Sequence, residues 1–426
     1  MRLSRTTFST QATGTQSQYA DKVKRMSLNI EMKKLHNLLL TVLIVSAGAV
    51  VGQEKTQQEK IDALEKQLIE LQAQADKPDF LNQAVAKGLS FNFYGTLKYK
   101  SGGGSQKADP HRMVLIPSYK LSDYAKFVSE LEFEHGGVKD GSNDRFSGAV
   151  ELEQMYIDVQ VADNITWRSL GVSLIPVGTI NEHHEPDLFY SAYRPQIYKQ
   201  LIPTTWMEMS TGIHGDIPQF EGLSYNLLIS QGPDGNSGNQ ARGTDTASTW
   251  SLKNMRPDMN NNNFDDIATT LKLGYDVGGF SSSVSTYQSK LTNQDGETSD
   301  MDLYVASAAY RFQDGSLKGL ELIGDYAVWD FGAPANITDS AVGDITWDEQ
   351  KGYRIEAAYH IPRGENELVP FVRYEKFDAG GATVNEKEYF TTGAMYKFGD
   401  NWEIKTSYMK LKDGANEIQV AVGVQF

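Results

Sequence analysis

The sequence predicts an all-β fold: a transmembrane antiparallel β-barrel of about 16 strands, preceded by a short N-terminal coiled-coil helix. Three observations lead to this prediction. Runs of about ten residues alternate between apolar and polar side chains, as barrel strands do. The connections between these runs are short at one end of the predicted barrel and long at the other. The chain also stops on an alternating strand, ANEIQVAVGVQF, whose last residue is Phe426.

Composition limits what the protein can do. The chain has 426 residues, a formal net charge of −15 and no cysteine. Without cysteine it has no disulfide, no thiolate metal site and no thiol nucleophile. The acidic balance argues against nucleic acid as a partner, because such proteins need a basic surface. A mean hydropathy of −0.44 does not fit a bundle of membrane helices.

The N-terminal part contains a secretory signal peptide at residues 32–49, MKKLHNLLLTVLIVSAGA. Two lysines are followed by a short apolar core and then by small residues that suit a cleavage site. The apolar stretch is too short for a spanning helix, which disfavours the alternative of an uncleaved anchor. Residues 1–31 are polar and without periodicity, so we interpret them as a non-native extension, with the start at Met32 or Met26.

Residues 50–80 are predicted to form a periplasmic coiled-coil segment. Its apolar residues step by three, four and three positions, which is the spacing of a coiled-coil seam: Ile61, Leu64, Leu68 and Leu71. The alternative is a single amphipathic helix that lies on a neighbouring surface. We favour an oligomerising coiled coil, because a globular helix usually carries a wider apolar face.

Residues 81–426 are assigned to the barrel. In YRIEAAYHI, Ile355 and Tyr359 fall on one face, whereas Arg354, Glu356 and His360 fall on the other. A soluble sandwich would turn the apolar face inward, but an outer-membrane barrel turns it toward lipid. Strands of about ten residues with aromatic ends, together with the signal peptide, favour the barrel.

The predicted connections alternate between long upper loops and tight lower turns, as in bacterial barrels. The upper connections are residues 101–112, 136–147, 179–205, 232–266, 291–299, 332–350, 378–387 and 412–415. With an even number of strands, the first strand starts and the last strand ends on the same side of the membrane, which is the periplasmic side. The last strand must then close the barrel against the first, which explains why it ends on a paired aromatic residue.

Several stretches resemble the phosphate-selective porin family and its general-porin relatives. They are ELEQMYIDV (151–159), LIPVGTINEHHEPDLFYSAYRP (174–195), IPTTWMEMSTGIHG (202–215) and LSYNLLISQGPDG (223–235). The resemblance implies a water-filled channel in the outer membrane of a Gram-negative bacterium, open to passive diffusion of small hydrophilic solutes and ions. It also implies a homotrimer, contact with outer-membrane lipid and lipopolysaccharide, and Phe426 as a signal for the barrel assembly machinery. No cofactor or catalytic step is implied.

The predicted pore wall carries both signs of charge, unlike the basic ladder of phosphate-selective members. The candidates are Lys98, Glu130, Glu132, Arg311, Asp325, Arg354, Glu356, Arg373 and Glu375. Such a mixed wall predicts weak ion selectivity. One alternative is an anion- or phosphate-selective porin in which Arg194, Arg311, Arg354 and Arg373 converge. Another is a structural barrel that mainly tethers its coiled coil.

The third upper connection, 179–205, is the predicted constriction, because the third loop of trimeric porins folds into the barrel. Its ionisable residues are Glu182, His183, His184, Glu185, Asp187 and Arg194. A metal site is not expected, since adjacent histidines on an extended chain point in different directions and metal ligands must converge. An enzyme is not expected either, because the chain has no GxSxG motif and no Gly-rich phosphate loop.

Overall fold

The computed structural model describes residue 66 and residues 84–137, 148–203, 205–233, 256–257, 259, 264, 266–292, 298–339, 343–378 and 386–426. Within these, the side chains of 291–292 and 332–348 are left undescribed. The expected extension (1–31), signal peptide (32–49) and coiled-coil seam (Ile61, Leu64, Leu68, Leu71) lie outside the described residues. Residues 84–426 form one compact unit.

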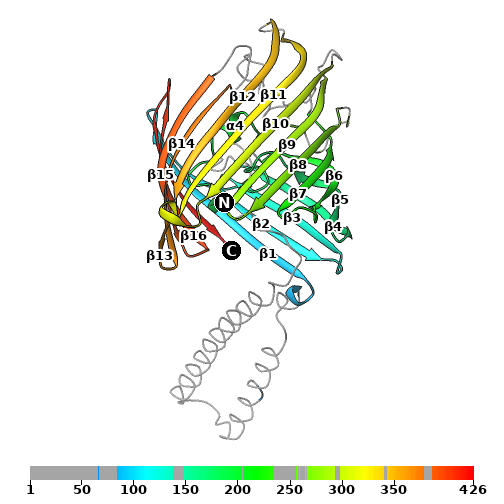
Figure 1. Cartoon of the computed structure of the whole chain (residues 1–426), viewed down its shortest axis with the longest axis horizontal. Coiled ribbons are helices and arrows are strands. Elements are labelled where there is room, and N and C mark those ends of the chain that lie inside the picture. Colours follow the sequence, from blue (N-terminus) through cyan, green and yellow to red (C-terminus); the bar gives the residue numbers. More distant parts are fainter. Residues whose placement is uncertain are drawn as a thin grey trace, which may run out of the picture. The chain divides into compact units, whose positions relative to one another are not determined.

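The described unit is built almost entirely from strands (Figure 1). They are β1 (Leu89–Gly102), β2 (Ser105–Lys120), β3 (Ala125–Glu134), β4 (Val150–Ala162), β5 (Ile165–Leu174), β6 (Met207–Asp216), β7 (Leu223–Ser230), β8 (Ala268–Val277), β9 (Phe280–Thr292), β10 (Thr298–Arg311), β11 (Leu320–Asp339), β12 (Gly343–Tyr359), β13 (Ile361–Arg363), β14 (Asn366–Asp378), β15 (Glu386–Phe398), β16 (Trp402–Leu411) and β17 (Glu417–Gln425). The short helices are η1 (Pro186–Leu188), α4 (Ile197–Gln200) and η5 (Gly315–Leu317). No helix in this part of the chain is long and apolar enough to cross a lipid bilayer.

The strands close into an antiparallel barrel. Each strand pairs with the next, and β17 returns to pair with β1. β13 continues β12 after His360, and both pair with β14. The 17 segments therefore make 17 − 1 = 16 strands, which confirms the predicted fold class.

The last residue takes part in closing the barrel. Phe426 donates its backbone N–H to the Phe93 carbonyl at 2.9 Å, and Phe93 donates in return to the Phe426 carbonyl at 3.0 Å. The two rings stack with their centroids 5.2 Å apart. The β1–β17 register runs from Tyr94 opposite Gln425 to Gly102 opposite Glu417, so the C-terminus is held as a strand end.

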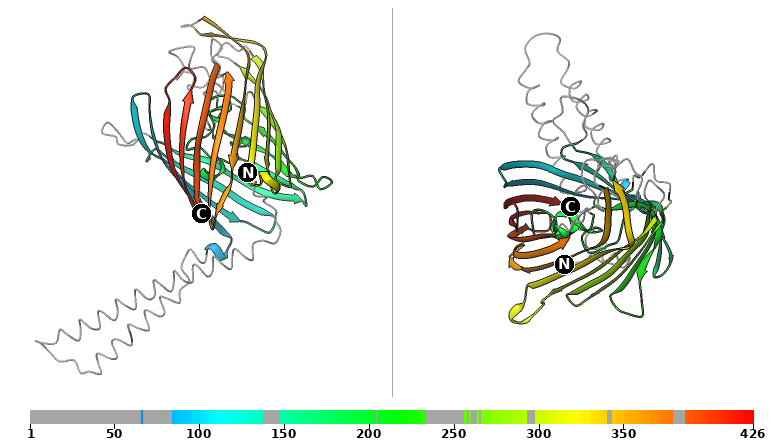
Figure 2. Two further views of the ribbon diagram at one scale, coloured as in Figure 1. Left: turned by 60° about the vertical axis from the view of Figure 1, so that its left-hand side comes forward. Right: turned by 90° about the horizontal axis from the view of Figure 1, so that it is seen from above.

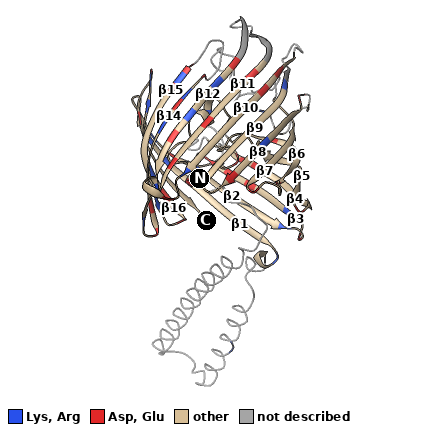
Figure 3. Ribbon diagram, in the orientation of Figure 1, with Lys and Arg blue, Asp and Glu red and all other residues tan. Residues whose placement is uncertain are grey.

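Side chains alternate across the wall as the sequence predicts. On β10, Tyr304 and Tyr310 are exposed on the outside, whereas Val305, Ser307 and Ala309 are buried on the inside. The same division holds on β12, where Ile355 is exposed and Arg354 and Glu356 are buried. Residues of both charge signs occur on the same strands (Figure 3).

Two predicted upper loops are wrong. Residues 105–112 belong to β2, and the backbone of 343–350 belongs to β12. Gly103 and Gly104 have φ of 58° and 81°, so they form a two-residue hairpin that lets β1 and β2 extend past the predicted loop start. The polar composition of 101–112 was misleading, because both faces of a strand that rises beyond the lipid can be polar.

Candidate functional site

The connection between β5 and β6, residues 175–206, lies inside the barrel and is called the inner loop here. It carries η1 and α4, and α4 is seen within the ring of strands (Figures 1 and 2). η1 contacts β1 and β17, and α4 contacts β12 and β14. The loop therefore reaches strands that are far apart around the wall.

Asn181 fixes the base of the inner loop. Its Nδ2 donates to the backbone carbonyls of Ile175 (2.8 Å) and Trp206 (2.9 Å). Its Oδ1 accepts the backbone N–H of Trp206 at 2.8 Å. Ile175 also donates its own N–H to the Trp206 carbonyl. A buried amide thus joins both ends of the loop and satisfies backbone groups that water does not reach.

A close turn brings the loop against β9 and β11. Gly178 has φ of 63°, and a Cβ there would lie 2.5 Å from the Tyr198 hydroxyl, so no other residue fits. Tyr198 accepts the backbone N–H of Thr179 and donates to Asp325 Oδ1, both at 2.9 Å. Gly178 donates its N–H to Ser285 at 3.1 Å.

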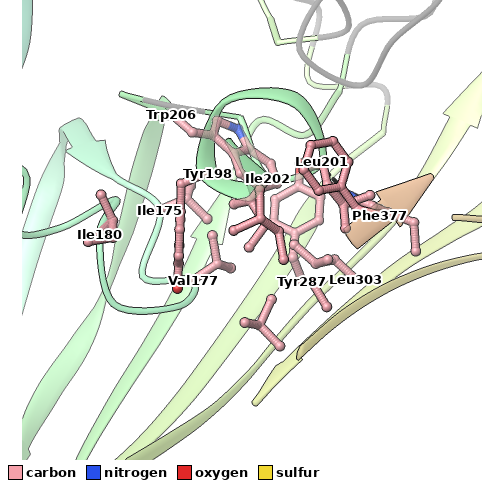
Figure 4. Packing of buried hydrophobic residues seen from close by; sticks show 14 of the residues in the cluster. Ile175, Val177, Ile180, Tyr198, Leu201, Ile202, Trp206, Tyr287, Leu303 and Phe377 are labelled. Carbon is pink, nitrogen blue, oxygen red and sulfur yellow. Dashed lines mark hydrogen bonds between the residues drawn. The ribbon is translucent and has the colours of Figure 1, made fainter. Parts of the chain in front are cut away.

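One side of the inner loop packs into an apolar cluster on the barrel wall (Figure 4). Ile197, Leu201 and Ile202 of the loop are fully buried there. The wall contributes large side chains that point inward, such as Tyr287 and Trp329. Trp329 also donates its indole N–H to the Leu201 carbonyl at 3.0 Å. This packing excludes water and removes a large apolar area from the lumen.

Buried ion pairs also hold the inner loop on the side where it packs into the apolar cluster. Arg373 contacts Glu356 at 3.0 Å and Glu375 at 2.9 Å, and it donates to the Ser191 hydroxyl at 2.7 Å. Glu375 accepts the backbone N–H of Ile197 at 3.0 Å. The loop is therefore held by charged groups that neutralise one another.

Two further wall groups belong to this region. Arg354 pairs with Asp325, the carboxylate that accepts from Tyr198. Tyr190 donates to Glu321 and lies 3.1 Å from His360 Nε2. We call this part of the loop surface, facing β8–β12 and β14–β15, the anchored side.

The opposite part of the loop surface faces β1–β4 and β16 and is called the ionic side. Lys98 is buried in the lumen, and its ammonium lies 4.6 Å from the centre of the Tyr193 ring. Arg112, Arg194 and Lys405 lie within electrostatic range of Lys98. A cluster of cations therefore lines the lumen between β1, β2, β16 and the loop.

Carboxylates from β3 and β4 adjoin this cluster. Glu130, Glu132 and Glu153 are each less than 4% exposed. The Arg112 guanidinium lies 3.6 Å from Glu132 and donates to the His184 carbonyl at 2.6 Å. Glu153 has no partner in the β3–β4 register, because Glu130 pairs with Gln154 and Leu131 with Leu152. This β-bulge turns an extra carboxylate into the lumen.

Some ionic groups on this side are bonded, such as Lys405, which donates to the Pro186 and Phe189 carbonyls, but others are not. Among the described residues, several buried charged atoms accept or donate no hydrogen bond: Arg112 Nε, Glu132 Oε1, both oxygens of Glu153, Glu185 Oε2 and both oxygens of Glu403. Asp325, Glu356 and Glu375 are all hydrogen-bonded by contrast. Desolvated charges without partners are costly, so this side is suited to meet ions or polar solutes.

The predicted loop residues are distributed between the two sides. Glu182 pairs with Lys272 at 2.6 Å, and Asp187 pairs with Lys397 at 3.1 Å. Burial lowers the pKa of His183, and it lowers the pKa of His184 to about 3. Burial raises the pKa of Glu185 to about 7. His184 is therefore a neutral imidazole at physiological pH.

Arg194 stays a cation. Burial and the neighbouring Arg112 lower its pKa to about 10, which leaves the guanidinium charged at neutral pH. Its Nη1 donates to the Thr205 hydroxyl at 2.9 Å. Arg194 is thus the one member of the predicted arginine set that joins the cation cluster of the ionic side.

The predicted convergence of four arginines is wrong. Arg354 and Arg373 are engaged by carboxylates on the anchored side, and Arg311 pairs with Glu367 at 3.2 Å. The predicted wall residues do face the interior, but Asp325, Glu356 and Glu375 hold the loop in place. The wrong prediction arose because one sequence shows which face a charge occupies but not which partner it meets.

Sequence reasoning missed Arg112, Asn181 and Glu153. Arg112 was assigned to a loop because its neighbourhood is polar. Glu153 is the extra residue of a bulge, where simple alternation fails. A possible signal was the run ELEQ, in which Glu151 and Glu153 are separated by one residue within an otherwise alternating strand. No local pattern marks Asn181.

Comparison with known families identifies the chain. The family of Gram-negative porins matches residues 136–416, well over half of the sequence. The chain belongs to the Gram-negative porins. The porin is therefore an outer-membrane protein that forms a channel, and its family and fold favour a channel over an enzyme. It is also 28% identical over 358 residues to an uncharacterized protein of Aquifex aeolicus, with 76% of each chain covered.

Solved structures support the fold of the porin. It is similar to OmpF of Salmonella typhi in complex with daunomycin (13% identity, TM-score 0.53, 80% of this chain and 98% of that one). It is also similar to an anion-selective porin from Comamonas acidovorans (15%, 0.51, 79% and 100%). A trimer form of OmpT, an outer membrane protein of Vibrio cholerae, gives 11% identity, a TM-score of 0.50, and coverage of 79% and 99%.

Proposed function

We propose that the inner loop is the constriction of this porin and that small hydrophilic solutes and ions diffuse past its ionic side. The observation that carries the proposal is the asymmetry of the loop. Apolar packing and closed ion pairs occupy the anchored side, whereas the ionic side presents charged atoms without partners. A solute can be stripped of part of its water only where such groups replace that water.

Cations and carboxylates lie side by side in the proposed passage. Lys98, Arg112 and Arg194 contribute positive charge, and Glu130, Glu132 and Glu153 contribute negative charge. Opposite charges on one wall retain water and orient polar solutes, but they discriminate weakly by sign. This mixture supports a general diffusion porin.

Anion preference is the second candidate, and Lys98 favours it. In the described part of the chain, its ammonium pairs with no carboxylate at salt-bridge distance, and the cations Arg112, Arg194 and Lys405 lie within electrostatic range of it. A mobile anion would relieve the mutual repulsion of this cluster. The anion would then meet Lys98 before the carboxylates of β3 and β4 repel it.

We propose a homotrimer with Phe426 as the assembly signal. The exposed aromatic ring at the end of β17 and the similarity to a protein solved in a trimer form support these two points. The apolar outer face suits contact with outer-membrane lipid and lipopolysaccharide. Molar mass of the detergent-solubilised full chain, measured by light scattering, tests the trimer: a monomeric mass from folded protein contradicts it.

Single-channel recording of the full chain in a planar bilayer with a salt gradient tests the proposed function. The wild-type porin should give stepwise conductance. Lys98→Ala should shift the reversal potential toward cations, because it removes the cation that has no carboxylate partner. Lys410→Ala is the matched control, since Lys410 is exposed on the outer face of β16 and should leave the potential unchanged.

Each other outcome is informative. Silence from well-folded protein contradicts the channel and favours a structural barrel. Conductance with the same reversal potential in Lys98→Ala and wild type contradicts the role of Lys98 and leaves the general porin standing.

A further inference from the structure

The strongest unexplained feature of the molecule is a group of metal-ligating side chains where the inner loop meets β3 and β4. Glu130 of β3, Glu153 of β4 and His184 of the loop are all buried. One ligand atom from each lies within 4.8 Å of the others. His184 Nε2 is 3.5 Å from Glu153 Oε2. These groups come from three separate segments of the chain.

Both ring nitrogens of His184 have polar neighbours. Nδ1 lies 3.1 Å from the Asn181 carbonyl oxygen, which can only accept, so Nδ1 carries the proton. Nε2 then carries a lone pair, and it lies 3.0 Å from the Tyr94 hydroxyl oxygen and 3.5 Å from Glu153 Oε2. The Tyr94 hydroxyl has one proton for both Glu130 Oε1 and His184 Nε2, so these two acceptors and the Glu153 carboxylate share too few donors, and a cation among them would satisfy all three. A carbonyl that orients the distal imidazole nitrogen is the usual outer-shell partner of a metal-bound histidine.

Glu130 is also held in place by neighbouring groups. Its Oε1 accepts the Tyr94 hydroxyl at 2.9 Å, and its Oε2 accepts the Gln154 amide. Glu153 differs, because neither of its carboxylate oxygens has a hydrogen-bond partner and its side chain is fully buried. The β-bulge that inserts Glu153 aims this carboxylate at Glu130 and His184.

The local charges balance for a dication. Arg112 lies 3.6 Å from Glu132 and offsets that carboxylate. Glu130 and Glu153 then supply two negative charges beside the imidazole, with the Arg194 guanidinium also within electrostatic range of Glu153. Carboxylate and imidazole donors together suit zinc and similar transition metals, whereas calcium and magnesium prefer oxygen donors alone. Zinc binds such donors at about 2 Å, which a small movement of these side chains provides.

We propose that Glu130, Glu153 and His184 bind a divalent transition-metal cation, with zinc the best match, and that the ion fastens the inner loop to β3 and β4. The bound ion would supply the partner that Glu153 lacks. It would also add an attachment on the ionic side, beside the bond from Arg112 to the His184 carbonyl. The site goes beyond the proposed diffusion function and does not depend on it.

The competing explanation is a proton shared between Glu153 and the adjacent Glu132. A second, more exposed cluster, Asp109, His111 and His135, also has ligating side chains at the rim. His135 Nδ1 is 2.8 Å from Asp109, and the two imidazole rings are 5.6 Å apart. A test must therefore separate the buried site from both the proton and the rim cluster.

The experiment titrates Zn²⁺ into the metal-stripped, folded full chain in detergent by isothermal calorimetry. The background is His111→Ala, which removes the rim cluster and leaves the buried site intact. We expect one Zn²⁺ per chain, and we expect Glu153→Gln in that background to weaken binding at least about tenfold. Ca²⁺ should give no comparable binding. Anomalous scattering at the zinc edge should place the ion between Glu130, Glu153 and His184.

Three results would overturn the proposal. They are no stoichiometric Zn²⁺ binding in the His111→Ala chain, unchanged binding after Glu153→Gln, and an anomalous peak elsewhere. Circular dichroism and heat-modifiable migration on gels check that Glu153→Gln is folded. Glu130→Gln is the second variant if it is not, with the same expected loss. Conductance measured in parallel separates failure of the metal site from failure of the channel.

Discussion

The two sides of the inner loop show how one segment can be both fixed and exposed to ions. On the anchored side, Trp329, Tyr287 and the loop's aliphatic residues form a dry cluster, and Arg373 is neutralised by two carboxylates. On the ionic side, Lys98 has aromatic but no carboxylate contact, and Glu153 and Glu403 have oxygens without partners. Glu375 of the anchored side and Glu403 of the ionic side are both fully buried, so burial alone does not distinguish the two sides.

The difference indicates a division of labour within the loop. Apolar packing and satisfied ion pairs stabilise one geometry, because moving the loop would expose apolar area and break paired charges. Charged atoms without partners stabilise nothing by themselves. They remain tolerable because the anchored side holds the loop in place, and they are then free to interact with whatever enters the lumen.

The largest expected effect comes from removing the centre of the anchored side. Trp329→Ala should lower the free energy of unfolding by about 3–5 kcal/mol, because it opens a cavity and leaves the Leu201 carbonyl unbonded. It should also raise single-channel conductance, since the loop loses its main support. Urea unfolding in detergent and bilayer recording measure the two effects.

Trp402→Ala is the control for this change. Trp402 is half exposed on the outer face and stacks on Phe398, so its removal should leave conductance unchanged. Equal conductance in wild type and Trp329→Ala would show that the anchored side does not set the position of the loop.

A matched pair of glutamates gives the sharpest comparison. Glu375 and Glu403 are both fully buried, but Glu375 is bonded to Arg373 and to the Ile197 N–H, whereas Glu403 has no hydrogen bond. Glu375→Gln should reduce the free energy of unfolding by about 1–3 kcal/mol. Glu403→Gln should change it by less than about 1 kcal/mol, or increase it, because an unpaired charge becomes neutral.

Chemical denaturation of both variants in one detergent measures the pair. A loss for Glu403→Gln that equals the loss for Glu375→Gln would mean that the two sides do not differ in polar satisfaction.

The smallest expected effect comes from single hydroxyl groups. Tyr198→Phe removes the bonds to Asp325 and Thr179 and should lower the free energy of unfolding by about 1 kcal/mol. Tyr193→Phe keeps the ring that faces Lys98 and should have no measurable effect on stability. Thermal unfolding by circular dichroism compares the two, and a reversed order of melting temperatures would contradict the assignment of the sides.

The sequence was informative about the wall and poor about the partners within the lumen. Alternation in YRIEAAYHI predicted that Ile355 faces out and Arg354 faces in, and the structure agrees. The inner loop was recognised because it is the third upper connection, which folds into the barrel in the trimeric porins that the sequence resembles. Its Asn181 staple was not predicted, because no local pattern marks that residue. Its division into two sides was not predicted either, since it depends on contacts between residues more than a hundred positions apart, such as Tyr198 with Asp325.

Some errors have a specific physical cause. A β-bulge inserts one residue, so the faces assigned by alternation slip beyond it, and Glu153 was missed for this reason. The expectation that the histidine pair forms no metal site rested on adjacent residues alone. The proposed zinc site instead uses one histidine with carboxylates from two strands, a combination that local spacing does not reveal.

The sequence by itself determined the class of fold, which face of each strand is apolar, and the pairing of the terminal aromatic residue. These features follow from the two-residue alternation of side chains along a strand and from the need of backbone groups in lipid to be hydrogen-bonded. Both constraints act locally along the chain. Only the tertiary structure decided which charges meet. Closing sixteen strands around a folded-in loop brings distant side chains to within hydrogen-bonding distance, and that convergence separates the anchored side from the ionic side.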